Sequence, residues 1–303
     1  MPSEAPAWLR VHPEVASALA SGRPVVALES TVITHGLPEP VNLELARRLE
    51  GEVRTAGAVP ATVAVIDGRV CLGVTTDELE RLALSRKLMK ISRRDFGAAL
   101  ASRATGGTTV AATMIAAHAG GIRVFATGGI GGVHRGDPGD VSADLPELAR
   151  TPVIVVCAGA KAILDLPRTL EWLETAGVPV LGWGTDDFPA FFSRSSGLRV
   201  SARVDNAADA AALIRAQWAM GLQSGVLVCV PCPEDHAVPA EAVEPVLRQA
   251  LQQAEAQGVR GKDVTPFLLA RLADLTGGET LRANLALLRN NARVAAELAR
   301  TFA

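Results

Sequence analysis

The sequence lacks a net excess of either charge, and it lacks long apolar runs. Its 303 residues include 30 Lys and Arg against 32 Asp and Glu, and no block of like charge is long enough to follow a nucleic-acid backbone. No run of about 18 apolar residues occurs, so no membrane span is expected. The N-terminal residues, with Glu4 and Arg10 among prolines, do not resemble a secretion signal. We therefore expect a cytoplasmic protein that binds neither nucleic acid nor membrane, although a small anionic ligand could bind at a local site.

Cysteine is also scarce. The four cysteines, Cys71, Cys157, Cys229 and Cys232, lie in apolar surroundings, which is typical of reduced core thiols and not of a disulfide framework. Cys229 and Cys232 have the CxxC spacing of redox and zinc sites, but they follow a predicted strand rather than opening a helix. No second CxxC or histidine pair completes a metal site. A redox or zinc role is therefore disfavoured.

The sequence does have enough apolar material for a large core, because 49% of its residues are hydrophobic and 20% are charged. Short β-branched runs recur, each followed by a turn and then by an alanine-rich amphipathic stretch. This alternation indicates βαβ units and predicts a three-layer α/β/α fold around a central sheet that is largely parallel or mixed. No low-complexity linker or fixed-period repeat divides the chain, so we expect a single domain over residues 1–303.

The expected elements follow from these patterns. The predicted strands are 25–28, 62–66, 123–127, 153–157, 178–182 and 225–230. The predicted helices are 40–56, 76–85, 108–119, 146–150, 167–176, 207–220 and 240–257, with residues 265–302 forming two more helices on either side of the Gly277-Gly278 break.

Unusual residues gather in four loops that follow predicted strands. These loops are 29–31, 127–136, 140–144 and 158–161. Open α/β sheets place their chemistry beyond the carboxyl ends of the strands. We therefore expect the four loops to face one cleft.

Two ionisable residues closely follow apolar strands. Only small residues separate Lys161 from the strand 153–157, so its stem is expected in a dry environment that favours a neutral, nucleophilic amine. The alternative is a solvated lysine early in the next helix, with Asp165 as a surface partner. Glu29 ends the strand 25–28, where a carboxylate is costly to bury unless it is hydrogen-bonded or serves as an acid or base.

Two glycine-rich stretches are candidate anion sites. Residues 127–136 form a loop that can turn backbone N–H groups towards an anion, although a flexible hairpin-like turn is the alternative. This loop is not a dinucleotide fingerprint, because His134 stands where the third glycine is required. Residues 106–109 are predicted to be a glycine turn that enters a helix, with threonines capping the exposed N–H groups.

Charged residues nearby supply further candidates. Lys90, with the segment 92–95 that follows it, provides cations that could complete a phosphate site, although such a cluster is more often a solvated face. Asp140 and Asp144 are four residues apart, and oxygen ligands of this kind suit Mg²⁺ or Mn²⁺ better than zinc. The alternative is an N-capping acid before a short helix.

Several of these segments, taken together, resemble one known family. They are VVALEST at 25–31, KISRRD at 90–95, FATGGIGGVHRG at 125–136, DVSADL at 140–145, VCAGAK at 156–161, TPFLLA at 265–270 and the Asn290-Asn291 pair. The set resembles the pseudouridine 5′-phosphate glycosidases, also called pseudouridylate synthases or indigoidine-synthase-A-like proteins. The match extends in order over nearly the whole chain, and motifs of this length are highly specific.

The resemblance implies cleavage of pseudouridine 5′-phosphate to uracil and ribose 5-phosphate by a homotrimer with Mn²⁺, Mg²⁺ or another divalent ion. By residue-level match, Lys161 would be the Schiff-base nucleophile at the sugar C1′ and Glu29 the proton donor and acceptor. Asp140 would hold the metal partly through water. The implied substrate contacts are Lys90, Thr109, Val110, Gly131, His134, Ser142, Ala143, Asp144 and Asn290, of which residues 142–144 would bind the sugar phosphate.

The implied chemistry is coherent with these residues. A C-glycoside has no leaving oxygen or nitrogen on its base, so simple protonation by paired carboxylates is insufficient. A lysine amine bonded to C1′ offers an iminium that stabilises cleavage, while Glu29 protonates the departing uracil at C5. Two alternatives stay open. One is a Schiff-base aldolase that acts on a sugar phosphate, and the other is a non-catalytic sugar-phosphate sensor, which would tolerate replacement of Lys161.

Overall fold

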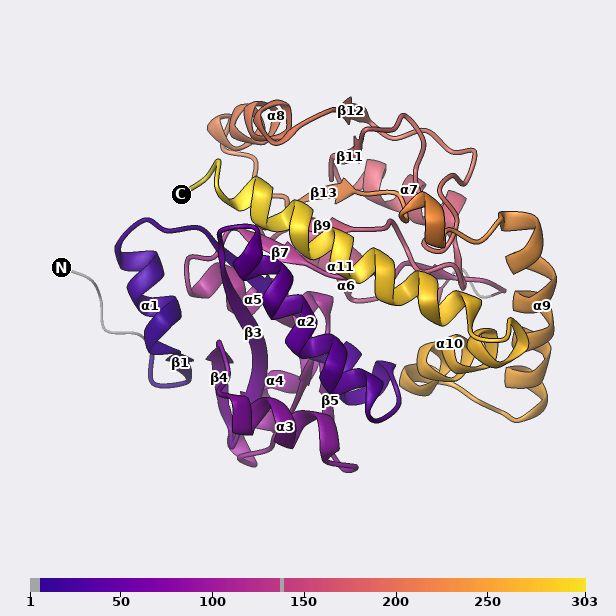
Figure 1. The fold of residues 1–303 in the computed structure, drawn as a ribbon, viewed down its shortest axis with the longest axis horizontal. Helices are drawn as coiled ribbons and strands as arrows, with labels where there is room; N and C mark the ends of the chain where they lie inside the picture. The colour runs from indigo at the N-terminus through magenta and orange to yellow at the C-terminus, as the bar shows by residue number, and fades with distance from the viewer. Residues whose placement is uncertain (1–5, 137–138) are drawn as a thin grey trace.

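The computed structural model describes residues 6–136 and 139–303, and it has helices on both faces of a central sheet (Figure 1). Neighbouring strands of this central sheet run parallel except where β3 meets β4 and β6. The predicted three-layer fold with a largely parallel, mixed sheet is therefore confirmed. The main path of the sheet runs through β1 (Leu9–Val11), β4 (Arg69–Leu72), β3 (Val59–Ile66), β2 (Val25–Leu28), β7 (Val124–Ala126), β9 (Ile154–Cys157), β13 (Val226–Cys229), β11 (Val180–Trp183) and β12 (Ala202–Val204).

Four further strands lie beside this path. β6 (Gly106–Thr108) pairs with β3 and with β5 (Met89–Ile91). β8 (Val133–His134) and β10 (Leu164–Asp165) form a separate antiparallel pair.

The helices divide between the two faces of the sheet. α11 (Glu279–Ala299) covers β2, β7 and β9, and α2 (Val41–Thr55) packs beside it over β3. α5 (Val110–Ala119) lies against the opposite face, next to α6 (Asp144–Leu148). The other helices are α1 (Pro13–Ala20), α3 (Thr76–Leu84), α4 (Phe96–Ala101), α7 (Leu166–Thr175), α8 (Ala207–Ala219), α9 (Ala240–Ala256) and α10 (Val264–Leu275).

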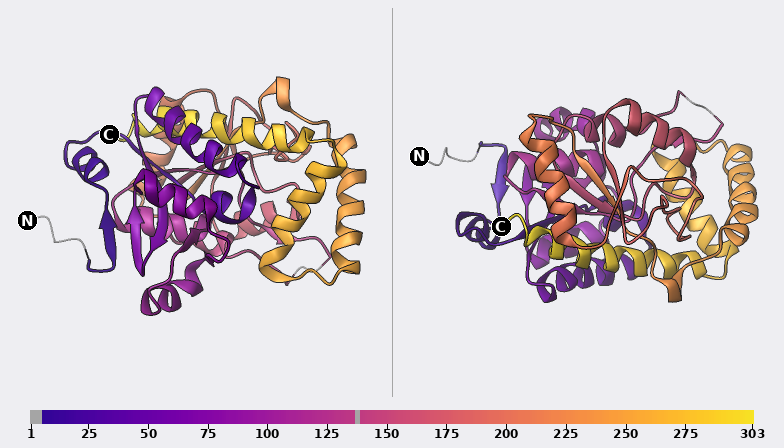
Figure 2. Two further views of the ribbon diagram at one scale, coloured as in Figure 1. Left: turned by 60° about the horizontal axis from the view of Figure 1, so that its bottom comes forward. Right: turned by 90° about the horizontal axis from the view of Figure 1, so that it is seen from above.

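Short helical turns complete the chain path. They are the π-helical η1 (Val32–Gly36) and the 3₁₀ turns η2 (Arg93–Asp95), η3 (Glu234–His236) and η4 (Gly261–Asp263). α9 and α10 pack as a pair at the end of the molecule far from α1 (Figure 2).

The side-chain pattern explains why these segments take this form. All eight residues of β3 are buried, as expected for a strand of a sheet that is covered on both faces. In α2, Leu45, Leu49 and Val53 recur every four residues and are buried, which gives the helix one apolar face. One hydrophobic cluster then extends from Leu9 in β1 to Ala299 at the end of α11.

Each predicted strand and helix is present, with bounds that differ by at most three residues. The elements that were not predicted are β1, β4, β5, β6, β8, β10, β12, α1 and α4. Most of these strands have only two or three residues, which is too short to show a period. β4 had a recognisable signal, because Asp67-Gly68 takes positive φ angles of 48° and 78° in the β3–β4 hairpin, as Asp-Gly pairs in tight hairpins do.

The glycine turn predicted before α5 is wrong. Gly106–Thr108 form strand β6, and α5 follows with Thr109 as its N-cap. A Cβ atom on Gly107 would lie 2.2 Å from the Thr34 hydroxyl oxygen and 2.9 Å from the Ser30 carbonyl oxygen. Glycine is therefore needed here because neighbouring chain segments approach β6 closely, not because the chain turns.

All four cysteines are buried, and none of them forms a disulfide, as expected of core thiols. Among the described residues, no helix has both the length and the apolarity needed to span a bilayer. The single domain over residues 1–303 stays a prediction.

Gly107→Ala tests the close approach of β6. We expect the added methyl group to lower the free energy of unfolding by about 1–3 kcal/mol, measured by urea denaturation. Gly97→Ala in α4 is the matched control, because nothing lies within 4 Å of its Cβ position, and it should be neutral or stabilising by up to about 1 kcal/mol. A Gly107→Ala protein as stable as the wild type would contradict the argument.

Candidate active site

A cavity of about 170 Å³ lies at the carboxyl ends of the central strands. Glu29 directly follows β2, Gly128 follows β7 by two residues, and Lys161 comes after three small residues beyond β9. Because β2, β7 and β9 are parallel neighbours, their loops leave the sheet at the same edge. The predicted site residues that line the cavity are Glu29, Lys90, Thr109, Val110, Gly131, His134, Ser142, Ala143, Asp144 and Lys161.

Glu29 is partly buried and is held by a hydrogen bond in this cavity. Its Oε1 atom accepts a hydrogen bond from the Thr127 hydroxyl. Burial raises the pKa of the Glu29 carboxyl, while the charge of Lys161 and the Thr127 hydrogen bond act in the opposite direction. The fully buried Asn291 of α11 donates to the Thr127 carbonyl oxygen at 2.8 Å. The position of Glu29 therefore depends on α11 as well as on β2.

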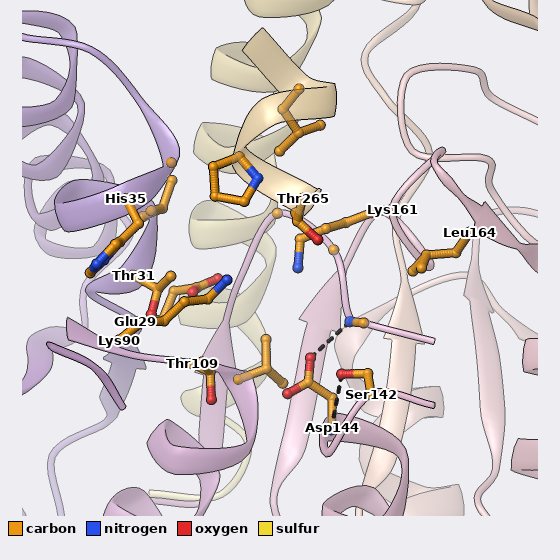
Figure 3. Close-up of a pocket in the computed structure, with 18 of the residues that line it drawn as sticks. Glu29, Thr31, His35, Lys90, Thr109, Ser142, Asp144, Lys161, Leu164 and Thr265 are labelled. Carbon is orange, nitrogen blue, oxygen red and sulfur yellow. Dashed lines mark hydrogen bonds between the residues drawn. The ribbon is translucent and has the colours of Figure 1, made fainter. Parts of the chain in front are cut away.

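Lys161 projects into the cavity from a backbone that is fixed on two sides. Its N–H donates to the Ile130 carbonyl oxygen at 3.1 Å, which ties it to the glycine-rich loop. Gly159 has a φ of 82°, and a Cβ atom there would lie 2.3 Å from the Pro189 carbonyl oxygen. Figure 3 shows the amine of Lys161 pointing between Glu29 and Asp144.

The alternative, in which Lys161 is a solvated lysine early in the next helix with Asp165 as its partner, is wrong. Lys161 precedes α7 by five residues and lies outside that helix. Asp165 instead caps α7, accepting the Arg168 N–H at 3.1 Å, and it forms an ion pair with the same arginine. Within the described ranges, Lys161 has no ion-pair partner within 4.0 Å.

Lys90 is a second amine in the cavity. It lies in β5, and its Nζ atom donates to the Lys262 carbonyl oxygen at 3.1 Å. Burial lowers the pKa of Lys90, and the charge of Lys161 lowers it further, whereas Glu29 and Asp144 raise it. The cavity therefore contains two amines and two carboxylates, and the other three groups act on the pKa of Lys90.

Asp144 was considered as the N-cap of the short helix that follows it, but its carboxylate caps α5 instead. It is the first residue of α6, yet its Oδ1 atom accepts the Ala111 N–H of α5 at 2.9 Å. Its Oδ2 atom accepts the Gly131 N–H at 2.8 Å, and its own N–H donates to the Ser142 hydroxyl at 3.2 Å. The glycine-rich loop thus turns a backbone N–H towards an anion, and that anion is the Asp144 carboxylate.

Asp140 and Asn290 do not line the cavity. The Asn290 side-chain oxygen accepts a hydrogen bond from Arg293 at 2.7 Å, on the outer side of α11. Asn284 and Leu288 of the same helix line the cavity instead. A spacing of four and then three residues from Asn284 through Leu288 to the buried Asn291 marks the inner face of α11, and this periodicity could have identified Asn284.

The basic cluster predicted near Lys90 contributes less than expected. Ser92 lines the cavity, but Arg93 is bound to the buried carboxylate of Glu147. The Arg94 side chain is 88% exposed, and its Nε atom lies 3.8 Å from Asp95 Oδ1. Neither arginine lines the cavity, so Lys90 is the member of this cluster that supplies it with a positive charge.

Residues from the segment after Glu29 and from α10 also line the cavity, in addition to the predicted site residues. Thr31 and His35 come from the segment after Glu29, and Thr265 and Leu269 come from α10. His35 Nδ1 lies 2.7 Å from the Thr34 hydroxyl oxygen, and burial lowers the pKa of the imidazole.

The predicted metal ligand, Asp140, lies on the surface near the cavity. Its side chain is 55% exposed, and its Oδ2 atom is 4.0 Å from His134 Nδ1. Among residues 6–136 and 139–303, no group of three His, Cys, Asp or Glu side chains is arranged to hold a metal ion. One carboxylate fits a hard divalent ion only if that ion keeps most of its water, as Mg²⁺ commonly does.

Comparisons with known proteins agree with one another. A family model described as "Indigoidine synthase A like protein" matches residues 14–301. A relative from Solibacter usitatus is 56% identical over 293 residues, and one from Chloroflexus aurantiacus is 59% identical over 297 residues. Both are named pseudouridine-5′-phosphate glycosidase, and the alignments cover 96% of this chain and 98% and 97% of those relatives, respectively.

Two solved structures are also similar over nearly the full chain. One is the prealnumycin C-glycosynthase AlnA in complex with ribulose 5-phosphate, with a TM-score of 0.90 and 43% identity, covering 98% of this chain and 97% of that chain. The other is an indigoidine synthase A-like protein from Thermotoga maritima, with a TM-score of 0.89 and 36% identity, covering 97% of each chain.

The raised pKa of Glu29 predicts a pH-dependent effect on stability. The folded protein keeps this proton to a higher pH than the unfolded chain does, so the favourable contribution is present at low pH and is lost as the pH rises through the folded pKa. We expect Glu29→Gln, which stays neutral, to gain stability relative to the wild type as the pH rises from 4.5. Urea denaturation between pH 4.5 and pH 8 measures this difference.

Thr127→Val is a matched comparison in which the loss of stability with rising pH should become larger, not smaller. It removes the hydrogen bond that lowers the pKa of Glu29, so its stability should fall more steeply with pH than that of the wild type. Curves that stay parallel for all three proteins would exclude a perturbed Glu29.

Proposed function

The chain belongs to the indigoidine synthase A-like family, as its motifs indicated, and on that premise we propose that it is a pseudouridine-5′-phosphate glycosidase acting through a lysine Schiff base. The reaction is the reversible cleavage of pseudouridine 5′-phosphate with water to give uracil and ribose 5-phosphate. The observation that carries the proposal is that Glu29 and Lys161 enter one cavity in a chain more than half identical to relatives of that name.

The bond to be broken dictates what the site must supply. The base is joined to the sugar through carbon, so the leaving electron pair arrives on C5 of uracil and must be met there by a proton. Paired carboxylates of ordinary glycosidases instead protonate a leaving oxygen. An amine and one acid are therefore a better match to this bond than two acids.

Lys161 is the proposed nucleophile. Its amine bonds to C1′, and the ring oxygen leaves C1′ and takes a proton, which opens the ribose ring. The C1′–C5 bond then breaks as the nitrogen lone pair forms a C1′ iminium, and the electron pair of the broken bond goes to uracil C5. Water hydrolyses the iminium, which releases ribose 5-phosphate and restores the amine.

Glu29 is the proposed proton donor and acceptor. Because burial raises its pKa, the carboxyl can hold a proton closer to neutral pH than an exposed carboxyl does, as a general acid requires. It donates this proton to uracil C5 and takes one back during hydrolysis. The Thr127 hydrogen bond keeps the carboxyl oriented between these steps.

The phosphate is proposed to bind on the side of the cavity formed by Lys90, Thr109, Ser142 and His134. Lys90 supplies a positive charge, and the hydroxyl and imidazole groups supply hydrogen bonds. Asp144 would act there by holding the backbone of Gly131 and Ala111, with Val110 and Ala143 as neighbouring wall residues. The complex of the related C-glycosynthase with ribulose 5-phosphate supports a pentose phosphate as the ligand.

A divalent ion, proposed as Mn²⁺ or Mg²⁺, would be held by Asp140 and waters. When bound, it would supply positive charge near the phosphate side of the cavity. The cytoplasmic location and the homotrimer stay predictions.

The first experiment is incubation of the purified protein with pseudouridine 5′-phosphate and Mn²⁺, with mass spectrometry of the products. We expect free uracil and ribose 5-phosphate in equal amounts. Failure of a folded, metal-supplemented protein to form either product would reject the proposed reaction and favour the aldolase or the sensor.

Lys161→Ala and Glu29→Gln test the two assigned roles. Loss of the nucleophile should lower kcat by roughly 10³-fold or more, and loss of the proton donor should lower it by about 10²- to 10⁴-fold. Borohydride should trap a sugar phosphate on the Lys161 peptide in the wild type. Lys90 is the matched control because it is the other lysine that lines the cavity, and trapping there would contradict the assignment.

Chelation tests the metal. We expect EDTA to reduce activity, Mn²⁺ to restore it, and Asp140→Ala to weaken the restoration by raising the Mn²⁺ concentration that is needed. Asp165→Ala, which removes the cap of α7, is a control that should leave the Mn²⁺ dependence unchanged. Full activity of the wild type in EDTA would remove the metal from the proposal.

A further inference from the structure

An ion pair lies just outside the cavity, with the Glu147 carboxylate buried and the Arg93 side chain 46% exposed. Glu147 in α6 has no exposed surface, and its carboxylate accepts hydrogen bonds from Arg93 Nε at 2.5 Å and Arg93 Nη2 at 2.7 Å. Arg150 and the Thr151 hydroxyl also donate to it. Burial alone would raise the pKa of Glu147, but the hydrogen bonds from Arg93, Thr151 and Arg150 hold it below its usual value. The pair is therefore charged and bidentate.

This pair joins the two segments that flank the first turn of α5. On one side, the Thr109 N–H donates to the carbonyl oxygen of the last residue of β5 at 2.9 Å. On the other side, the Ala111 N–H donates to Asp144 Oδ1 at 2.9 Å. Arg93 begins η2 just after β5, and Glu147 lies in α6 with Asp144. The Arg93–Glu147 pair thus closes a ring of contacts around the start of α5.

The two joined segments carry opposite parts of the cavity wall. Lys90 and Ser92 come from the β5 side, and Ser142 and Asp144 come from the α6 side. Neither Arg93 nor Glu147 lines the cavity. The pair can therefore act on a ligand only by setting the spacing between these two walls.

Stability alone is a poor reason for such a pair. Burying the Glu147 carboxylate is costly, and an ion pair whose arginine is 46% exposed adds little net stability. A bidentate arginine–carboxylate pair, however, fixes distance and orientation in a way that apolar contacts do not.

We propose that Arg93 and Glu147 are positioning residues for the phosphate group of the substrate. They hold the Lys90–Ser92 segment and the 142–144 turn at the separation that one phosphate can bridge. The inference rests on the proposed function, which puts the phosphate between these segments. It adds two residues that do not contact the substrate. The sequence had suggested Arg93 as a cation that binds the phosphate directly, and it had not indicated Glu147.

The test compares Arg93→Lys, Arg93→Met and the double variant Arg93→Met with Glu147→Met. Arg93→Lys keeps the charge and loses the bidentate geometry, so it should fold even if Arg93→Met does not. Arg94→Met is the matched control, because this neighbouring arginine is exposed and does not contact Glu147. For each protein, KM and kcat are measured with pseudouridine 5′-phosphate and with pseudouridine, which lacks the phosphate.

The expected result is a rise in KM for pseudouridine 5′-phosphate of about 10- to 100-fold in every Arg93 variant, with kcat changed less than threefold. The kcat/KM for pseudouridine should stay unchanged within the same limit. The double variant should be more stable than Arg93→Met, because the buried Glu147 carboxylate is removed together with Arg93, while its KM stays high. Arg94→Met should match the wild type throughout.

Two results would overturn the proposal. One is a double variant whose KM returns to the wild-type value together with its stability, because the pair would then be purely structural. The other is an equal loss of kcat/KM for both substrates, because the effect would then not act through the phosphate.

Calorimetric binding of ribose 5-phosphate and of inorganic phosphate separates this inference from the proposed function. If the wild type cleaves no pseudouridine 5′-phosphate, the proposed reaction fails, while dissociation constants still report on the phosphate site. We then expect both dissociation constants to rise about 10- to 100-fold in Arg93→Lys and the double variant. Unchanged constants for both ligands would reject the positioning role whatever the reaction is.

Discussion

The parallel register of β2, β7 and β9 is the constraint on which the site depends. Leu28 pairs with Ala126, and Ala126 pairs with Val156, so the next residues of all three strands reach the edge of the sheet at one level. Glu29 and Thr127 are therefore adjacent, and the strand register alone brings their side chains within hydrogen-bond distance. Lys161 reaches the same space after a short loop beyond β9. The site is thus a direct consequence of strand pairing.

The contents of the cavity then impose an electrostatic constraint. Two amines and two carboxylates share a small volume, where unpaired charge is costly. The carboxylates have different partners: Asp144 accepts two backbone N–H groups, whereas Glu29 accepts one hydroxyl. Carboxylates in contrasting surroundings commonly take different roles. In the mechanism proposed here, Asp144 shapes the phosphate side of the cavity, and Glu29 carries the proton.

Much of this arrangement could be predicted from local sequence. The apolar runs before Glu29 and Lys161 were recognisable as strands, and the rule that parallel strands place chemistry at their carboxyl ends brought their loops together. Asn290 shows where local reasoning stopped. It lies in a recognisable motif, but Asn284 faces the cavity, because the rotation of α11 about its axis is set by packing against β2, β7 and β9.

The sequence by itself determined the order of the longer strands and helices, the largely parallel sheet, the family and ten of the residues that line the cavity, because these depend on apolar periodicity and on contiguous motifs. Only the tertiary structure decided the partners of the charged side chains. Arg93 pairs with Glu147, 54 residues away in the chain, and Asp144 caps α5 rather than its own helix. Such contacts depend on how elements pack against one another, and the packing is set by the summed burial of many residues, not by any one segment.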